Sequence, residues 1–288
     1  MIMNDDVYDA IEPLNDSTIK AIYQTNKKLF DLAMKLSKLA HSVIPIGFKL
    51  EENTLNPTVE KTLVALYTQS YRLYRSIIIL CKSGLGIESL IMLRSLQETG
   101  TYLLYIAEKD HDVRLEHYWY STILSQHGRA KEYLEYFPDD KVKINFALFE
   151  KEKEEALQYF RKKHGKNVSE SDIKKKYTLK TVNIVQDLYE PKMVKNYKII
   201  FRDASSVAHG ENIRKYIKPN NTNLNTFYLT VSPTDNYVIL SITHSMMYIF
   251  HEMKRINELL KIIDSKLIND LEAEILELLK KLGRDVPL

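Results

Sequence analysis

An arginine and a histidine with helical spacing are the residues of this chain best suited to chemistry. They lie in the segment FRDASSVAHGE as Arg202 and His209, seven positions apart. On an α-helix this spacing places the two side chains about 20° apart on one face. Arginine stays charged and binds phosphate through a fork of donors, and histidine exchanges protons near neutral pH. The pair predicts metal-free cleavage of RNA, in which a 2′-hydroxyl attacks the adjacent phosphate.

The residues between this pair would assist in such a site. Ser205 and Ser206 occupy the intervening turn, at i+3 and i+4 from the arginine. Asp203 points about 100° away from Arg202, so we expect it to orient a neighbour or to bind across a helix interface, and not to touch a substrate. The candidate catalytic residues are therefore Arg202, His209 and Asp203, with the two serines in support.

A structural interpretation of the same histidine is also open. Gly210 follows His209, and glycine commonly ends helices. A histidine in the last turn interacts favourably with the helix dipole. The alternative to a nuclease is therefore a non-catalytic helical module. Such a module would use this helix for dimerisation or for binding a nucleotide or a protein.

The segment RDASSVAH resembles the motif of the HEPN superfamily, in which an arginine, a polar residue, a short spacer and a histidine follow one another. HEPN proteins are small helical bundles. Many of them are metal-independent endoribonucleases of toxin–antitoxin, abortive-infection and other phage-defence systems. The resemblance implies catalysis by Arg202, Asp203 and His209 without a metal or cofactor. It also implies an RNA substrate (tRNA among the candidates), a homodimer, and an antitoxin or other defence-system partner protein.

A second resemblance covers the segment LYRSIIILCKSGLGIESLIMLRSLQETGTYLLYI, residues 73–106. It is similar to the central helices of a family of uncharacterised bacterial proteins, with a step from Arg94 to Glu98. At i and i+4 these two residues predict an intrahelical ion pair that fixes helix packing. The functional alternative is that Glu98 orients Arg202 or His209 from across the bundle.

The charge of the chain is unevenly distributed. Residues 161–218 contain 15 lysines or arginines and 6 acidic residues, although the whole chain carries a formal net charge of only +3. A basic region of this kind favours an anionic partner such as RNA. A solvated lysine-rich face is the alternative interpretation. The candidates for RNA contact are Lys195, Lys198, Arg214, Lys215 and Lys218.

Composition and periodicity favour helices throughout. The chain is 44% hydrophobic and contains only 8 Gly and 8 Pro among 288 residues. The pattern predicts an all-α multi-helix bundle that forms a single domain, and the resemblance implies that its core is HEPN-like. We expect this core at about 57–264, with peripheral helices at 17–42 and 265–283. The alternating segment TFYLTV predicts at most one short strand or hairpin.

Several other classes of protein are disfavoured. Cys81 is the only cysteine, so neither an intrachain disulfide nor a cysteine-based metal cage is expected. A metal-dependent bundle enzyme would have to rely on Glu98, Glu108, His111 and their neighbours, because Glu108 and His111 form the only Glu-x-x-His unit. The acidic N-terminus lacks an apolar signal core, and no apolar run is long enough to span a bilayer. We therefore expect a cytoplasmic protein that does not contact membranes.

Overall fold

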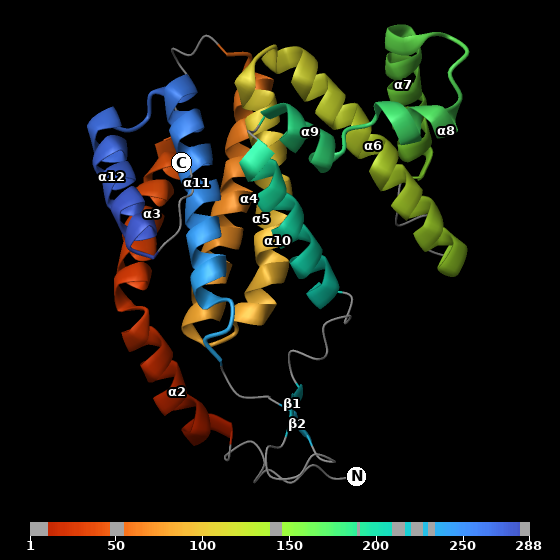
Figure 1. Cartoon of the computed structure of the whole chain (residues 1–288). Helices are drawn as coiled ribbons and strands as arrows, with labels where there is room; N and C mark the ends of the chain where they lie inside the picture. Colours follow the sequence, from red (N-terminus) through yellow and green to blue (C-terminus); the bar gives the residue numbers. More distant parts are fainter. Residues whose placement is uncertain are drawn as a thin grey trace. The chain divides into compact units, whose positions relative to one another are not determined.

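Helices make up most of the chain in the computed structural model (Figure 1). A short antiparallel ladder joins β1 (Ile217–Pro219) to β2 (Phe227–Leu229), with Ile217 opposite Leu229. The predicted all-α bundle with at most one short hairpin is thus confirmed. The structure describes residues 11–46, 55–138, 146–188, 191–208, 217–219, 227–229 and 234–282.

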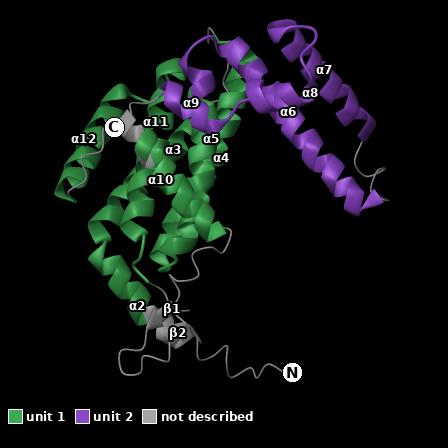
Figure 2. Ribbon diagram, turned by 45° about the vertical axis from the view of Figure 1, so that its right-hand side comes forward, with its two compact units in different colours: residues 1–104, 189–288 green, residues 105–188 purple. Residues whose placement is uncertain are grey.

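The chain divides into two compact units (Figure 2). Unit 1 comprises residues 1–104 and 189–288, and unit 2 comprises residues 105–188. The helices of unit 1 are α2 (Ile11–Thr25), α3 (Lys27–Ile46), α4 (Pro57–Lys82), most of α5 (Gly86–Glu108), α10 (Pro191–Ala208), α11 (Val238–Leu260) and α12 (Ser265–Lys281). Unit 2 holds α6 (His111–Tyr136), α7 (Phe146–His164), α8 (Glu170–Asp172), the π-helix η2 (Ile173–Tyr177) and α9 (Thr181–Leu188). The assignment of the whole chain to one domain stays a prediction.

The first helical segment differs from the expected single helix over 17–42. The structure contains two helices, α2 and α3, which meet at a turn at Asn26. The side-chain amide of Asn26 donates to the carbonyl oxygen of Ile22 at 3.0 Å. Asparagine side chains compete in this way with the helical hydrogen bonds of the backbone, which favours a break at this position.

The core of unit 1 forms where α3, α4 and α11 pack side by side (Figure 1). Two tyrosines of α4, Tyr67 and Tyr74, are fully buried. Their hydroxyls donate to the carbonyl oxygens of Ala40 at 3.0 Å and Ala33 at 2.8 Å, both on α3. Each ring thus buries a large apolar area while its polar end is satisfied, which fixes α3 against α4.

A tight turn joins α4 to α5 and contacts the start of α11. The backbone amide of Thr234 donates to the carbonyl oxygen of Gly84 at 2.9 Å. A side chain at Gly86 would place its Cβ 2.1 Å from the carbonyl oxygen of Asn236. Only glycine permits this approach of two backbones, so the glycine-rich break between the helices also positions α11.

The interior of unit 1 holds a buried carboxyl group, that of Glu252 on α11. It lies against Gly100 of α5, where a Cβ would be 2.2 Å from the Oε1 atom. Neither carboxyl oxygen forms a normal hydrogen bond with a residue that the structure describes. Burial raises the pKa of Glu252 to about 8, and the nearby hydroxyl of Ser70 offsets a smaller part of this shift. The carboxyl group is therefore predominantly protonated near neutral pH.

Unit 2 is built on the antiparallel packing of α6 and α7. The buried imidazole of His127 on α6 lies 2.7 Å from the carboxylate of Glu150 on α7, which links the two helices. The small core of unit 2 consists of Leu124, Ala156, Leu157, Phe160 and Ile173.

Within the described residues, no helix of either unit is long and apolar enough to cross a membrane.

Candidate functional site

Helix α10 carries the arginine of the candidate site. Its sequence is amphipathic, and Pro191 at its start suits the first turn of a helix. Tyr197, Ile200 and Ala204 recur at intervals of three and four residues and are buried in unit 1. This burial fixes the rotation of the helix, so the residues between them are turned toward solvent.

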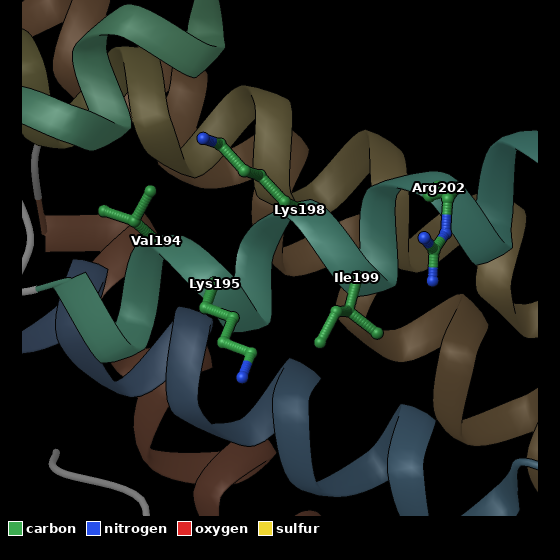
Figure 3. Close-up of a pocket in the computed structure, with 5 residues that line it drawn as sticks. All are labelled: Val194, Lys195, Lys198, Ile199 and Arg202. Atoms are coloured by element: carbon green, nitrogen blue, oxygen red, sulfur yellow. The ribbon is translucent and has the colours of Figure 1, made fainter.

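The solvent-facing side of α10 forms a shallow hollow of about 410 Å³ (Figure 3). Lys195, Lys198 and Arg202 are exposed there and form no hydrogen bond or ion pair with any residue that the structure describes. Ile199 lies among these cations and is 40% exposed. The hollow is lined by Val194, Lys195, Lys198, Ile199 and Arg202. Three uncommitted cations on one helix face are suited to an anionic group, for which an apolar side chain would add contact area.

Arg94 of α5 holds α10 in place. Its guanidinium donates to the Oγ atom of Ser205 at 2.9 Å and lies 4.2 Å from the ring centroid of Phe201. A hydrogen bond from a charged donor and a cation–π contact together stabilise such a junction by about 2 kcal/mol. The expected ion pair with Glu98 is present at 3.4 Å, with the two side chains 27% and 38% exposed. At this exposure the ion pair itself contributes little, and its effect is to orient Arg94.

The remaining supporting residues lie around the same turn of α10. The Oγ atom of Ser206 donates to the backbone carbonyl oxygen of Asp203 at 2.8 Å, within the helix. Asp203 is half-buried. Glu98 pairs with Arg94, and among the described residues it makes no ion pair with Arg202. The structure therefore brings together Arg94, Glu98 and Ser205, whereas Arg202 lies with the lysines of the exposed face.

Part of the predicted site falls beyond the described ranges. His209, Arg214 and Lys215 lie outside the described residues, and of Lys218 only the backbone in β1 is described. The pairing of Arg202 with His209 across the end of α10 thus stays a prediction. The contact of Arg214, Lys215 and Lys218 with RNA also stays a prediction.

The metal-dependent alternative requires a group of side chains that could bind a metal ion. Among the residues that the structure describes, no three histidine, cysteine or acidic side chains form a group suited to a metal ion. His111 lies with its Nδ1 atom 2.8 Å from the carbonyl oxygen of Ile106. This contact ties the start of α6 to the end of α5, which is a structural role for the histidine of the Glu-x-x-His unit.

Three residues that shape the site are not among those predicted from the sequence. Val194 and Ile199 complete the lining of the hollow, and Phe201 supports Arg94. The signal for the two aliphatic residues was their position among lysines on the polar face of α10, where apolar side chains are unexpected. Phe201 could not be identified, because its contact with Arg94 depends on how α5 and α10 pack.

Comparison with known proteins identifies one family. Residues 60–225, more than half of the chain, match the model described as "Family of unknown function (DUF5677)". The matched range includes α5 and α10 and therefore both Arg94 and Arg202. This match is consistent with the resemblance of the central helices to an uncharacterised family. No curated protein and no solved structure matches the chain.

Proposed function

We propose that this chain, which belongs to the family of unknown function DUF5677, is a metal-independent endoribonuclease of the HEPN type. The observation that carries the proposal is the exposed guanidinium of Arg202, which no described residue engages. Lys195 and Lys198 lie on the same face and would attract the RNA backbone. A structural arginine would instead be committed to internal partners, as Arg94 is.

The proposed reaction needs only side chains and the RNA itself. The 2′-oxygen of a ribose bonds to the adjacent phosphorus as its proton passes to His209, and the bond from phosphorus to the 5′-oxygen breaks. Arg202 neutralises the charge that develops on the phosphoryl oxygens. A second His209, from the partner in a homodimer, donates a proton to the leaving oxygen. The products are a 2′,3′-cyclic phosphate and a 5′-hydroxyl.

The biological role follows from the HEPN resemblance. This resemblance supports the interpretation that the chain is a defence or toxin effector that acts as a homodimer. An antitoxin or another defence-system protein would inhibit it. Among the described residues, the structural support is limited to α10 and its attachment through Arg94 to α5. This attachment holds the face with Arg202 in one orientation, and such preorganisation increases electrostatic stabilisation of a transition state.

A second candidate is a non-catalytic helical module that binds a partner through α10. The exposed Ile199 favours it, because an apolar side chain among cations is typical of contact surfaces. The two candidates differ in one outcome. The module predicts no RNA cleavage by the wild-type chain, whereas the nuclease predicts cleavage in the presence of EDTA.

The test is cleavage of total RNA and of tRNA in EDTA, with analysis of the product ends. We expect 2′,3′-cyclic phosphate ends from the wild-type chain, with a loss of about 100-fold or more in rate for His209→Ala and Arg202→Ala. Arg72→Ala is the matched control, since it removes an exposed arginine of α4 in the same unit. Absence of cleavage by the wild type would overturn the nuclease. Full activity of both site variants would overturn the assignment of the site to α10.

A further inference from the structure

A second basic surface lies in unit 2, at the end of α7 and in the segment that follows it. Residues 161–180 contain eight lysines or arginines and two acidic residues, whereas residues 146–160 contain two lysines and four glutamates. Positive charge is therefore concentrated at one end of the helix. A local excess of this size produces a field that attracts polyanions.

This basic segment is folded against its own small core. The ring of His164 stacks on that of Tyr177 with centroids 4.0 Å apart and planes 12° apart. Phe160 and Ile173 are buried in the core of unit 2. The end of α7 is thus joined to η2 by aromatic and apolar contacts. Cations held on such a scaffold lose less conformational freedom on binding than cations on a flexible tail.

Seven of the eight cations of this segment fall into two groups, and the eighth, Lys180, donates to the backbone carbonyl oxygen of Lys175 at 2.7 Å. The first group is neutralised in part by nearby carboxylates, through the pairs Arg161–Glu154 at 3.2 Å, Lys174–Glu170 at 2.7 Å and Lys176–Asp172 at 2.7 Å. Four further lysines are exposed and form no ion pair with any described residue: Lys162, Lys163, Lys166 and Lys175. These four supply the uncompensated charge of the surface.

The chemistry of this surface favours the phosphates of a nucleic acid over a protein or a membrane. No large hydrophobic side chain within residues 161–180 is exposed. Protein interfaces need an apolar centre, and helices that bind membranes need an apolar face to insert. A phosphate backbone requires only cations at suitable separations, and lysines bind it without regard to sequence.

We propose that Lys162, Lys163, Lys166 and Lys175 form a docking surface for the phosphate backbone of RNA, in a different unit from the Arg202 face of α10. The choice of RNA among phosphate polymers rests on the nuclease function proposed above, whereas the surface itself is defined by charge and exposure. The docking contacts are sequence-independent. They hold the RNA whether or not it is cleaved.

The test measures binding separately from cleavage. A short labelled single-stranded RNA is titrated with the full-length His209→Ala chain, and fluorescence anisotropy reports the affinity over a range of salt concentrations. The test variant changes all four docking lysines to glutamine. A control variant removes the same charge from four exposed lysines of unit 1: Lys28, Lys38, Lys61 and Lys266.

We expect the test variant to bind RNA about 100-fold more weakly at about 0.15 M salt if all four lysines contact phosphates, and about 10-fold more weakly if two do. The slope of log affinity against log salt should fall by about 0.7 for each lost contact. The control variant should bind nearly as the parent does, since exposed lysines that do not contact the RNA are largely screened at this salt concentration. Circular dichroism and thermal unfolding check that both variants are folded.

Three results would overturn the docking surface. The first is an equal loss of affinity in the test and control variants, and the second is no loss in either. The third is binding of poly-L-glutamate or phosphatidylserine vesicles as tightly as RNA, which would assign the surface to an acidic protein or to lipid. RNA cleavage by the wild-type chain, together with unchanged RNA binding by the test variant, would leave the nuclease standing without this surface. Binding that depends on these lysines, in a chain that never cleaves, would leave the surface standing without the nuclease.

Discussion

Replacement of Glu252 by glutamine should remove a pH dependence from the stability of unit 1. The carboxyl group is fully buried and forms no normal hydrogen bond with any described residue. Burial raises its pKa to about 8 in the folded chain. In the unfolded chain the group should titrate near its ordinary pKa of about 4.3. Between these two values the folded state holds one proton more than the unfolded state.

The sign and size of the effect follow from this difference in bound protons. Where the folded state binds more protons, the free energy of unfolding falls as pH rises, by up to about 1.4 kcal/mol per pH unit. Integrated from about pH 5 to about pH 8, the loss comes to about 3.5 kcal/mol. The stabilisation is fully present below the unfolded pKa and is lost as pH rises toward the folded pKa. The neighbouring Tyr67 and Tyr248 do not contribute in this range, because burial raises the pKa of both hydroxyls.

The assay is urea unfolding, followed by circular dichroism at a series of pH values. Glu252→Gln keeps the shape of the side chain and cannot ionise, although its buried amide donors cost about 1–3 kcal/mol if unpaired. We therefore expect the variant to be less stable than the wild type at about pH 5, with the gap closing or reversing by about pH 8. Asp270→Asn, which neutralises an exposed carboxylate on α12, controls for net charge. A wild-type-minus-variant difference that stays constant with pH would refute the buried, protonated carboxyl.

Two further substitutions test the packing of α5. Gly100→Ala should destabilise unit 1 by about 1–3 kcal/mol in thermal unfolding, because its Cβ would lie 2.2 Å from a Glu252 oxygen that burial holds in place. Gly128→Ala on α6, where the Cβ would meet nothing within 4 Å, should instead stabilise by up to about 1 kcal/mol. Equal effects would contradict the contact at Gly100. Arg94→Ala should cost about 2 kcal/mol and increase amide hydrogen exchange in α10 more than in α4, since contacts with Ser205 and Phe201 are lost. Uniform exchange in both helices would mean that Arg94 does not hold α10.

Local patterns in the sequence account for much of the fold. The sequence of helix α5 is apolar almost all round, which is typical of a helix in the middle of a bundle, and Leu90, Leu93 and Leu96 are fully buried. The glycines between α4 and α5 favour a break in the helix there, and one of them also permits the contact with Asn236. Each of these features depends on a few neighbouring residues. Hydrophobic periodicity and backbone freedom express such features directly.

Other features depend on competition between local and distant contacts. The sequence from about Ser169 to Tyr189 favours a continuous helix, but the structure forms α8, the π-helix η2 and α9 in this segment. The stacking of Tyr177 on His164 and the burial of Ile173 accompany the change of helical form. Glu252 illustrates the same difficulty in the core. It lies on the same face of α11 as Ile249 and Ile256. A glutamate at such a position indicates either that the buried face of the helix is wrongly assigned or that a carboxyl group is buried. The sequence does not distinguish these two interpretations.

The two arginines of the candidate site show why function needs the tertiary structure. Arg94 and Arg202 have the same side chain, and each lies on a helix beside residues that could support catalysis. Arg94 is committed to Phe201 and to Ser205, which is 111 positions away, so its guanidinium is occupied before any ligand binds. Arg202 faces solvent without a described partner and can exchange water for phosphate at little cost. Of the two, Arg202 is therefore the one that the proposed function assigns to phosphate, and in that proposal Arg94 affects RNA only through the position of α10.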